Sequence, residues 1–247
     1  MSGWEFWVVA VIAAVFTGIG KGGLPMIGTL TVPMLSLVIS PVAAAGMILP
    51  VYILSDLFGL YAYRHDWDKR VLMIACVSMT LGVALGWATA RLIPEAAVTV
   101  LLGVIAVAFS LNQLLRKVVI TQPRRAEWGS GLFWCTIAGF TSFVSHSGGP
   151  PYQIWTLPLG MKKAVFAGTS TIAFSYINAI KLVPYFFLGQ INLESIEVAV
   201  MLMPIAAVSV FIGVWVVKRL PEKLFFTIVT WSLLVIGVQL IWKGLQG

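Results

Sequence analysis

Two short glycine-rich stretches interrupt long apolar segments of this chain, and polar side chains within them could bind an anion. The first stretch contains Gly20, Lys21, Gly22 and Gly23. Lys21 would supply a positive charge, and a helix that restarts after such a break presents free backbone N–H groups and the positive end of its dipole. Two alternatives stay open, because the glycines would also allow close helix packing and Lys21 could extend its ammonium group to a membrane surface.

The second stretch carries matching donors, in the order Ser145, His146, Ser147, Gly148 and Gly149. Hydroxyl and imidazole groups can donate hydrogen bonds to the oxygens of an oxyanion. Tyr152 and Gln153 follow and are further candidates to line the site, although ordinary packing would explain them equally well. His146 has a similar alternative, that of an interior histidine with satisfied hydrogen bonds.

Two ionisable residues lie deep within other apolar segments, Asp56 in 41–63 and Lys181 in 164–187. Charges at membrane depth are costly, and they are usually paired or functional. We expect Asp56 and Lys181 to meet, either as a fixed ion pair between two halves of the protein or as a relay for protons or substrate. Asn178, about one helical turn before Lys181, could point into the same space.

The composition is that of a chain whose solvent is lipid. Of its 247 residues, 60% are hydrophobic and only 10% are charged, whereas about a quarter are charged in a soluble domain. The net charge of +7 is explained by basic residues in cytoplasmic loops, and we find no nucleic-acid-binding motif. The composition therefore predicts an all-α integral membrane protein.

No motif for a cofactor, a metal ion or ATP hydrolysis is present in the sequence. Cys76 and Cys135 lie in apolar runs, and neither has a C-x-x-C partner, so we expect no disulfide and no metal site. The G-x-x-x-x-G-K-[ST] pattern of ATP-hydrolysing proteins is missing, which argues against a transporter driven by its own ATPase.

Apolar segments of about 20 residues can cross a bilayer as helices. Six segments are long and unbroken enough, namely 41–63, 71–91, 96–115, 164–187, 194–217 and 223–243. Two more, 4–39 and 130–160, contain the glycine-rich stretches, and the prolines and glycines there predict that each helix ends and restarts.

The two halves of the chain resemble each other. Arg91 and Glu95 flank a turn that matches the one between Arg219 and Glu222, and the glycine-rich stretches match in the same order. We therefore predict an N-terminal transmembrane repeat over 1–118, a basic cytoplasmic linker over 119–128 and a C-terminal transmembrane repeat over 129–247.

The distribution of Lys and Arg predicts how the segments cross the membrane. If each broken stretch is a hairpin that returns to the side it entered from, twelve basic residues share one side and two share the other; if it crosses once, the split is eight to six. The first arrangement obeys the positive-inside rule. Each repeat then has one re-entrant hairpin and three transmembrane helices, the repeats are inverted, and both termini lie outside the plasma (inner) membrane.

The glycine-rich segment 18–23, the Ser147-Gly148-Gly149-Pro150 segment and the two-half layout resemble the TauE/SafE sulfite-exporter family. The resemblance covers essentially the whole chain. It implies transport of an oxidised-sulfur anion such as sulfite or an organosulfonate, and residues of the two stretches as the substrate site.

We therefore expect a secondary transporter that works by alternating access on such an anion. The driving energy would come from a proton gradient, the membrane potential or the substrate gradient. The sequence is also compatible with a homodimer. Alternatives are an anion channel, an uptake permease for another small organic anion, and an intramembrane enzyme that uses His146 with Ser145 or Ser147.

Overall fold

A computed structural model of the chain describes residues 3–22, 25–28, 30–115, 123–219 and 222–246, and these residues form helices and connecting turns without a strand. The elements are α1 (Trp4–Lys21), α2 (Pro25–Gly28), α3 (Thr31–Leu35), α4 (Pro41–Ala62), α5 (Lys69–Thr89), α6 (Glu95–Leu115), α7 (Trp128–Ser145), α8 (Gly149–Thr156), η1 (Leu157–Leu159), α9 (Lys163–Phe187), α10 (Leu193–Arg219) and α11 (Glu222–Gln246). This architecture confirms the predicted all-α class.

Local capping explains where two of the long helices begin. The Ser40 hydroxyl accepts a hydrogen bond from the Ala43 N–H at 3.3 Å, and Pro41 occupies the first turn of α4. The Asp68 carboxylate accepts from the Val71 N–H at 2.9 Å at the start of α5. Such caps satisfy N–H groups that have no partner within the helix.

Five of the described helices are long and apolar enough to cross a membrane: α1, α4, α5, most of α6 and most of α10. Along α5, Met73, Val77, Leu81 and Leu85 form an exposed stripe at four-residue spacing, as expected for a face in contact with lipid chains. The 25-residue helix α9 is not among the five, since polar residues such as Asn178 and Lys181 lower its mean hydropathy.

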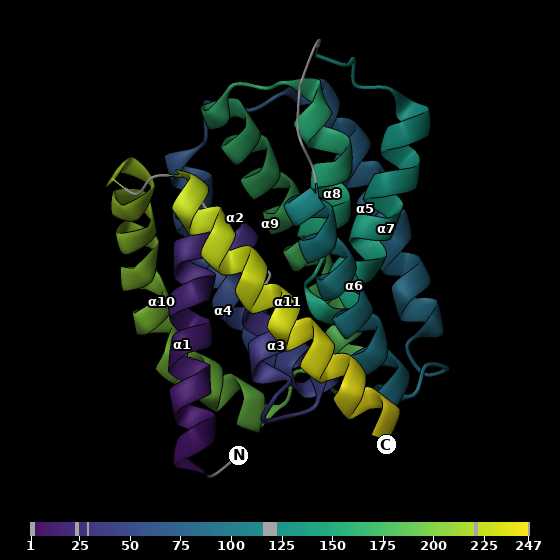
Figure 1. The fold of residues 1–247 in the computed structure, drawn as a ribbon, viewed down its shortest axis with the longest axis vertical. Coiled ribbons are helices and arrows are strands. Elements are labelled where there is room, and N and C mark those ends of the chain that lie inside the picture. The colour runs from purple at the N-terminus through teal and green to yellow at the C-terminus, as the bar shows by residue number, and fades with distance from the viewer. Residues whose placement is uncertain (1–2, 23–24, 29, 116–122, 220–221, 247) are drawn as a thin grey trace.

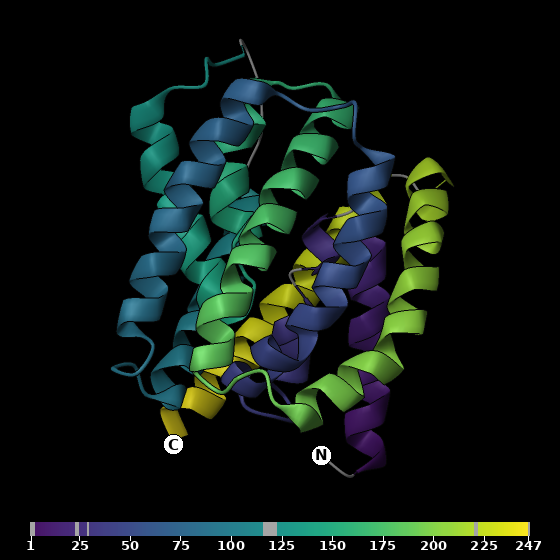
Figure 2. The ribbon, with the colours of Figure 1, turned by 180° about the vertical axis from the view of Figure 1, so that it is seen from behind.

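The two interrupted stretches fold as hairpins that start from opposite ends of the bundle. In Figure 1, α1 runs inward from the end that holds the N-terminus, whereas α7 runs inward from the other end and α8 turns back beside it. The two chain ends share one end of the bundle, as Figures 1 and 2 show from opposite sides.

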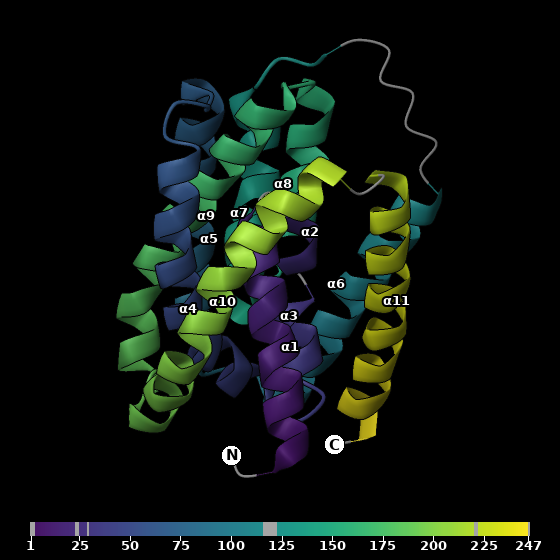
Figure 3. The same ribbon diagram turned by 90° about the vertical axis from the view of Figure 1, so that its left-hand side faces the viewer.

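Contacts between helices are similar in the two halves: a pairing that involves a helix of one half has a counterpart that involves the matching helix of the other half. Helix α5 packs on α7 and α10 packs on α1; α5 also contacts α9, as α10 contacts α4; and α6 packs on α11. Figure 3 shows α1 and α10 side by side and α6 facing α11. A pseudo-two-fold relation between halves would produce this pattern, so it supports the inverted-repeat prediction, which stays a prediction.

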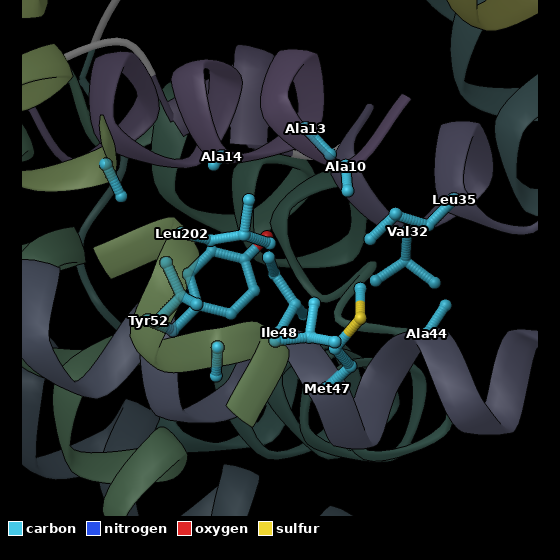
Figure 4. Close-up of a cluster of buried hydrophobic side chains, with 14 of the residues drawn as sticks. Ala10, Ala13, Ala14, Val32, Leu35, Ala44, Met47, Ile48, Tyr52 and Leu202 are labelled. Atoms are coloured by element: carbon cyan, nitrogen blue, oxygen red, sulfur yellow. The ribbon is translucent and has the colours of Figure 1, made fainter. Parts of the chain in front are cut away.

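The apolar core is also shared between the halves. One cluster joins α1, α3 and α4 to Leu202 and Ala206 of α10, and Figure 4 shows Ala10, Val32 and Ile48 among its members. A second cluster joins α4 and α5 to α7, α8 and α9. The small residues along α1 let the neighbouring helices approach closely, so that the first broken hairpin is held in a fixed position.

Candidate functional site

A cavity of about 70 Å³ lies between the two broken stretches. It is lined by Thr17, Gly20, Lys21, Gly28, Tyr52, Ser142, His146, Gly149, Ser170, Thr171, Phe174 and Asn178. Both halves of the chain contribute, through α1, α2 and α4 on one side and through α7, α8 and α9 on the other. Since one water molecule needs about 10–15 Å³ of such space, the cavity has room for several waters or one small ion.

Lys21, at the last residue of α1, forms an ion pair with Asp56 of α4. The second carboxylate oxygen of Asp56 accepts a hydrogen bond from the Asn178 side chain at 2.8 Å. The Lys21 ammonium also lies 5.1 Å from the centroid of the Tyr52 ring, a distance at which the ring face attracts a cation. Lys21 lines the cavity and Asp56 does not, so the positive partner of the pair faces the cavity.

Lys181 and His146 form a second pair of ionisable side chains. The Lys181 Nζ lies 2.8 Å from Nδ1 of His146 and 3.1 Å from both the carbonyl and the hydroxyl oxygen of Ser142. His146 Nε2 lies 3.1 Å from the Ala45 carbonyl oxygen. Because a carbonyl only accepts, Nε2 must carry the hydrogen, which leaves Nδ1 of a neutral imidazole to accept from the lysine.

His146 owes its position to an unusual backbone conformation. It caps α7 with φ 54°. This value lies in the left-handed backbone region, which residues other than glycine rarely adopt. The imidazole is held between two aromatic rings, with centroids 4.8 Å from Tyr52 and 6.1 Å from Tyr185. The chain therefore reverses direction at a residue that also lines the cavity.

The expected direct contact between Asp56 and Lys181 is replaced by two separate contacts. Lys21 and Asn178 occupy the two oxygens of Asp56, and Lys181 extends toward α7 instead. The position of Asn178 one turn before Lys181 explains the difference, since it brings the shorter amide to the carboxylate and leaves the longer lysine to reach another helix.

Among the expected donors of the second stretch, His146 and Gly149 line the cavity. The Ser145 hydroxyl instead donates to the Thr141 carbonyl, and the Ser147 hydroxyl donates to the Ser145 carbonyl, each at 3.3 Å. Gly148 serves close packing, because a Cβ there would lie 2.5 Å from the Ala138 carbonyl oxygen. These three residues shape the turn and are not in the lining.

In the first stretch, Gly20 and Lys21 line the cavity and Gly22 caps α1. The prediction for Gly23 lies outside the residues that the structure describes. Tyr152 and Gln153 are buried in α8 and do not line the cavity; Tyr152 packs on Phe174, which does, with ring centroids 5.3 Å apart. Tyr152 thus supports the cavity wall.

Sequence reasoning missed several lining residues, notably Tyr52, Ser142, Ser170 and Phe174. Serines in apolar helices are common, because a hydroxyl can bond its own helix backbone, as Ser55 does with the Val51 carbonyl at 2.9 Å. Nothing in the sequence distinguished Ser142 from such residues.

The geometry gives no support to the nucleophile–base pair of the enzyme alternative. Both nitrogens of His146 are engaged, by Ala45 and Lys181, and the hydroxyls of Ser145 and Ser147 bond backbone carbonyls. A general base would need a free nitrogen within reach of the nucleophile. Among the described residues, no group of three or more His, Cys, Asp or Glu side chains could hold a metal ion.

Comparisons with known proteins give one match. No curated protein and no solved structure matches the chain significantly. The family model described as Sulfite exporter TauE/SafE matches residues 6–240. The match covers both glycine-rich stretches and every residue that lines the cavity, and it confirms the resemblance found in the sequence: this chain belongs to the TauE/SafE sulfite-exporter family.

Proposed function

We propose that this protein is a secondary transporter that moves sulfite or a small organosulfonate across the plasma (inner) membrane by alternating access. The observation that carries the proposal is the cavity between the two broken hairpins, with Lys21 and His146 in its wall and Lys181 directly behind His146. Family membership supports an oxidised-sulfur anion as the cargo.

The charges around the cavity favour an anion. Lys21 and Asp56 neutralise each other, and Asn178 is neutral, so Lys181 adds one uncompensated positive charge when it is protonated. An oxyanion in the cavity would complement this charge and accept hydrogen bonds from Lys21 and from hydroxyls such as Ser170 and Thr171. The small volume supports a compact anion over one with a long hydrocarbon chain.

A channel is the main alternative, and a second cavity bears on the choice. This cavity, of about 260 Å³, is lined by Val42, Gly86, Ala90, Arg91, Ile93, Val98, Phe143, Val144, Leu188 and Gln190. One turn of α7 separates the two cavities, because Ser142 and His146 line the first while Phe143 and Val144 line the second. The Tyr185 hydroxyl donates to the Phe143 carbonyl at this barrier. Two cavities with different linings on either side of this turn are what we expect of a carrier, whose site opens to one side of the membrane at a time.

Reconstituted protein distinguishes these functions. In proteoliposomes, we expect sulfite flux to saturate with concentration and to show counterflow, in which unlabelled sulfite inside accelerates uptake of labelled sulfite. Flux that rises linearly without counterflow would establish a channel. The absence of flux and binding for both sulfite and sulfonates would refute the proposed cargo. Driving export and import separately with imposed gradients tests the uptake alternative.

A further inference from the structure

Lys181 is a fully buried lysine whose hydrogen-bond partners are all neutral groups. Its exposed fraction is 0%, and its ammonium contacts the Ser142 carbonyl, the Ser142 hydroxyl and His146 Nδ1. A buried charge without a counter-charge is costly. Either an anion must supply the missing negative charge or the proton must leave.

The charged and titratable groups around this pair leave that choice open. On α1 and α4, Lys21 and Asp56 satisfy each other in an ion pair. The two rings that flank His146, Tyr52 of α4 and Tyr185 of α9, direct their hydroxyls to the backbone carbonyls of Gly28 and Phe143. None of these groups gives Lys181 a direct carboxylate partner.

The contact between Lys181 and His146 limits the pair to one shared charge. Nζ and Nδ1 are 2.8 Å apart, and Nε2 keeps its hydrogen for the Ala45 carbonyl. One hydrogen can therefore lie between the two nitrogens, on Nζ of an ammonium or on Nδ1 of an imidazolium that faces a neutral amine. Two cations would place two donors against each other.

We propose that the Lys181–His146 pair is the proton-coupling site of this transporter: it takes up one proton when an anion occupies the cavity and releases it when the anion leaves. His146 lines the cavity and Lys181 lies behind it, so an anion there offsets the buried charge of the pair. The inference rests on the proposed function and identifies its coupling ion.

Reciprocity makes this coupling useful for transport. If the anion strengthens proton binding, the proton strengthens anion binding by the same factor. The loaded carrier then holds one monovalent anion and one added proton, with no net change in charge, and the empty carrier returns without either. The cycle is a symport of anion and proton, so the proton gradient and the anion gradient drive each other.

Proton uptake by the purified protein provides the test. Methanesulfonate is a suitable probe because it stays ionised, so any proton consumed on binding is bound by the protein. We expect about one proton per bound anion in weakly buffered solution, and an affinity that falls about tenfold per pH unit over the range in which the empty pair is deprotonated.

Two variants assign the proton to the pair. Lys181→Met should abolish proton uptake and weaken methanesulfonate binding at least about tenfold, since a charge-assisted interaction is lost. Lys181→Arg keeps a permanent charge, so a folded protein should bind the probe with a pH-independent affinity and no proton uptake. Lys243→Met is a matched control. Lys243 donates a hydrogen bond of 2.9 Å to the Ser36 carbonyl and is not part of the cavity lining.

Each outcome bears on the inference. Binding by the wild-type protein without proton uptake would overturn the coupling and leave the proposed function standing. Proton uptake that persists in Lys181→Met would assign the proton to another group and overturn the inference. Proton uptake that is lost in the single variant Asp56→Asn would do the same. If neither methanesulfonate nor sulfite binds, the proposed function fails and the inference fails with it.

Discussion

Lys21 pairs with the carboxylate of Asp56 and also lines the cavity in which we propose that an anion binds. It lines the cavity while it holds its ion pair with Asp56, and the Tyr52 ring lies against its ammonium. A bound anion would compete with Asp56 for the same positive charge. The ion pair therefore both positions Lys21 and sets how strongly it can bind a ligand.

Replacing Lys21 should weaken the binding of anions. For folded Lys21→Ala, we expect sulfite or methanesulfonate affinity to fall by about tenfold or more, because a charge-assisted hydrogen bond is lost. Lys21→Arg should rescue this only in part, since a planar guanidinium does not replace a compact ammonium. Calorimetric titration in detergent measures both. An unchanged affinity in Lys21→Ala would remove Lys21 from the site.

Lys21 and Asp56 should also be coupled in stability. Lys21→Ala leaves a buried carboxylate with Asn178 as its remaining partner, so we expect a loss of about 3–5 kcal/mol. The double variant Lys21→Ala/Asp56→Asn should recover much of the lost stability, because no unpaired charge remains. A double-mutant cycle of unfolding in detergent measures the coupling. Asp56→Asn combined with the distant Lys243→Ala is the control, for which we expect additive changes in stability. Additive changes for Lys21 and Asp56 would show that their ion pair contributes nothing to stability.

At the level of elements, glycines fix how closely the broken helices approach their neighbours. Gly86 of α5 packs on Phe143 of α7, and Gly213 of α10 packs on Ile19 of α1. Each broken helix is therefore held by the same kind of contact from a helix of the other half, which keeps the two hairpins opposed across the cavity.

Substitution of Gly139 tests this packing. A Cβ at Gly139 of α7 would lie 2.2 Å from the Met79 carbonyl oxygen of α5, whereas a Cβ at Gly129 of the same helix meets nothing within 4 Å. We expect Gly139→Ala to cost about 1–3 kcal/mol through overpacking. Gly129→Ala should be neutral or slightly stabilising, because alanine has the higher helix propensity. Thermal unfolding in detergent compares them; equal midpoints would contradict the tight contact.

For the molecule as a whole, the arrangement of helices and the distribution of basic residues make a joint prediction of topology. The chain ends share one end of the bundle, and α7 begins at the other (Figure 1). From the twelve-to-two division of basic residues, we predict that the end of the bundle that holds the start of α7 faces the cytoplasm.

Cysteine labelling from outside the cell checks this topology. With Cys76 and Cys135 replaced by alanine, we expect an impermeant reagent to label Gly3→Cys in intact cells and Arg125→Cys only after the membrane is opened. Gly3 and Arg125 are both exposed, so access depends on the side of the membrane. Equal labelling of the two in intact cells would refute the inverted arrangement of the hairpins.

The sequence by itself determined the elements, because each depends on local properties of the chain. Apolar segments of bilayer length predicted the six unbroken helices, and the structure places their ends within three residues of the expected positions. Glycine and proline predicted both interruptions, since these residues end helices wherever they occur. Lys21 and His146 were identified as candidates because polar groups at such interruptions are rare in an apolar chain.

The tertiary structure decided which of these residues meet. Asp56 and Lys181 were expected to pair, yet Asp56 contacts Lys21 and Asn178 while Lys181 contacts His146. These partners come from helices far apart in the chain, and their choice depends on side-chain direction and reach, which spacing along one helix does not give. The left-handed backbone of His146, held by packing between α4 and α9, was likewise beyond local sequence rules, because tertiary contacts stabilise a conformation that the residue alone disfavours.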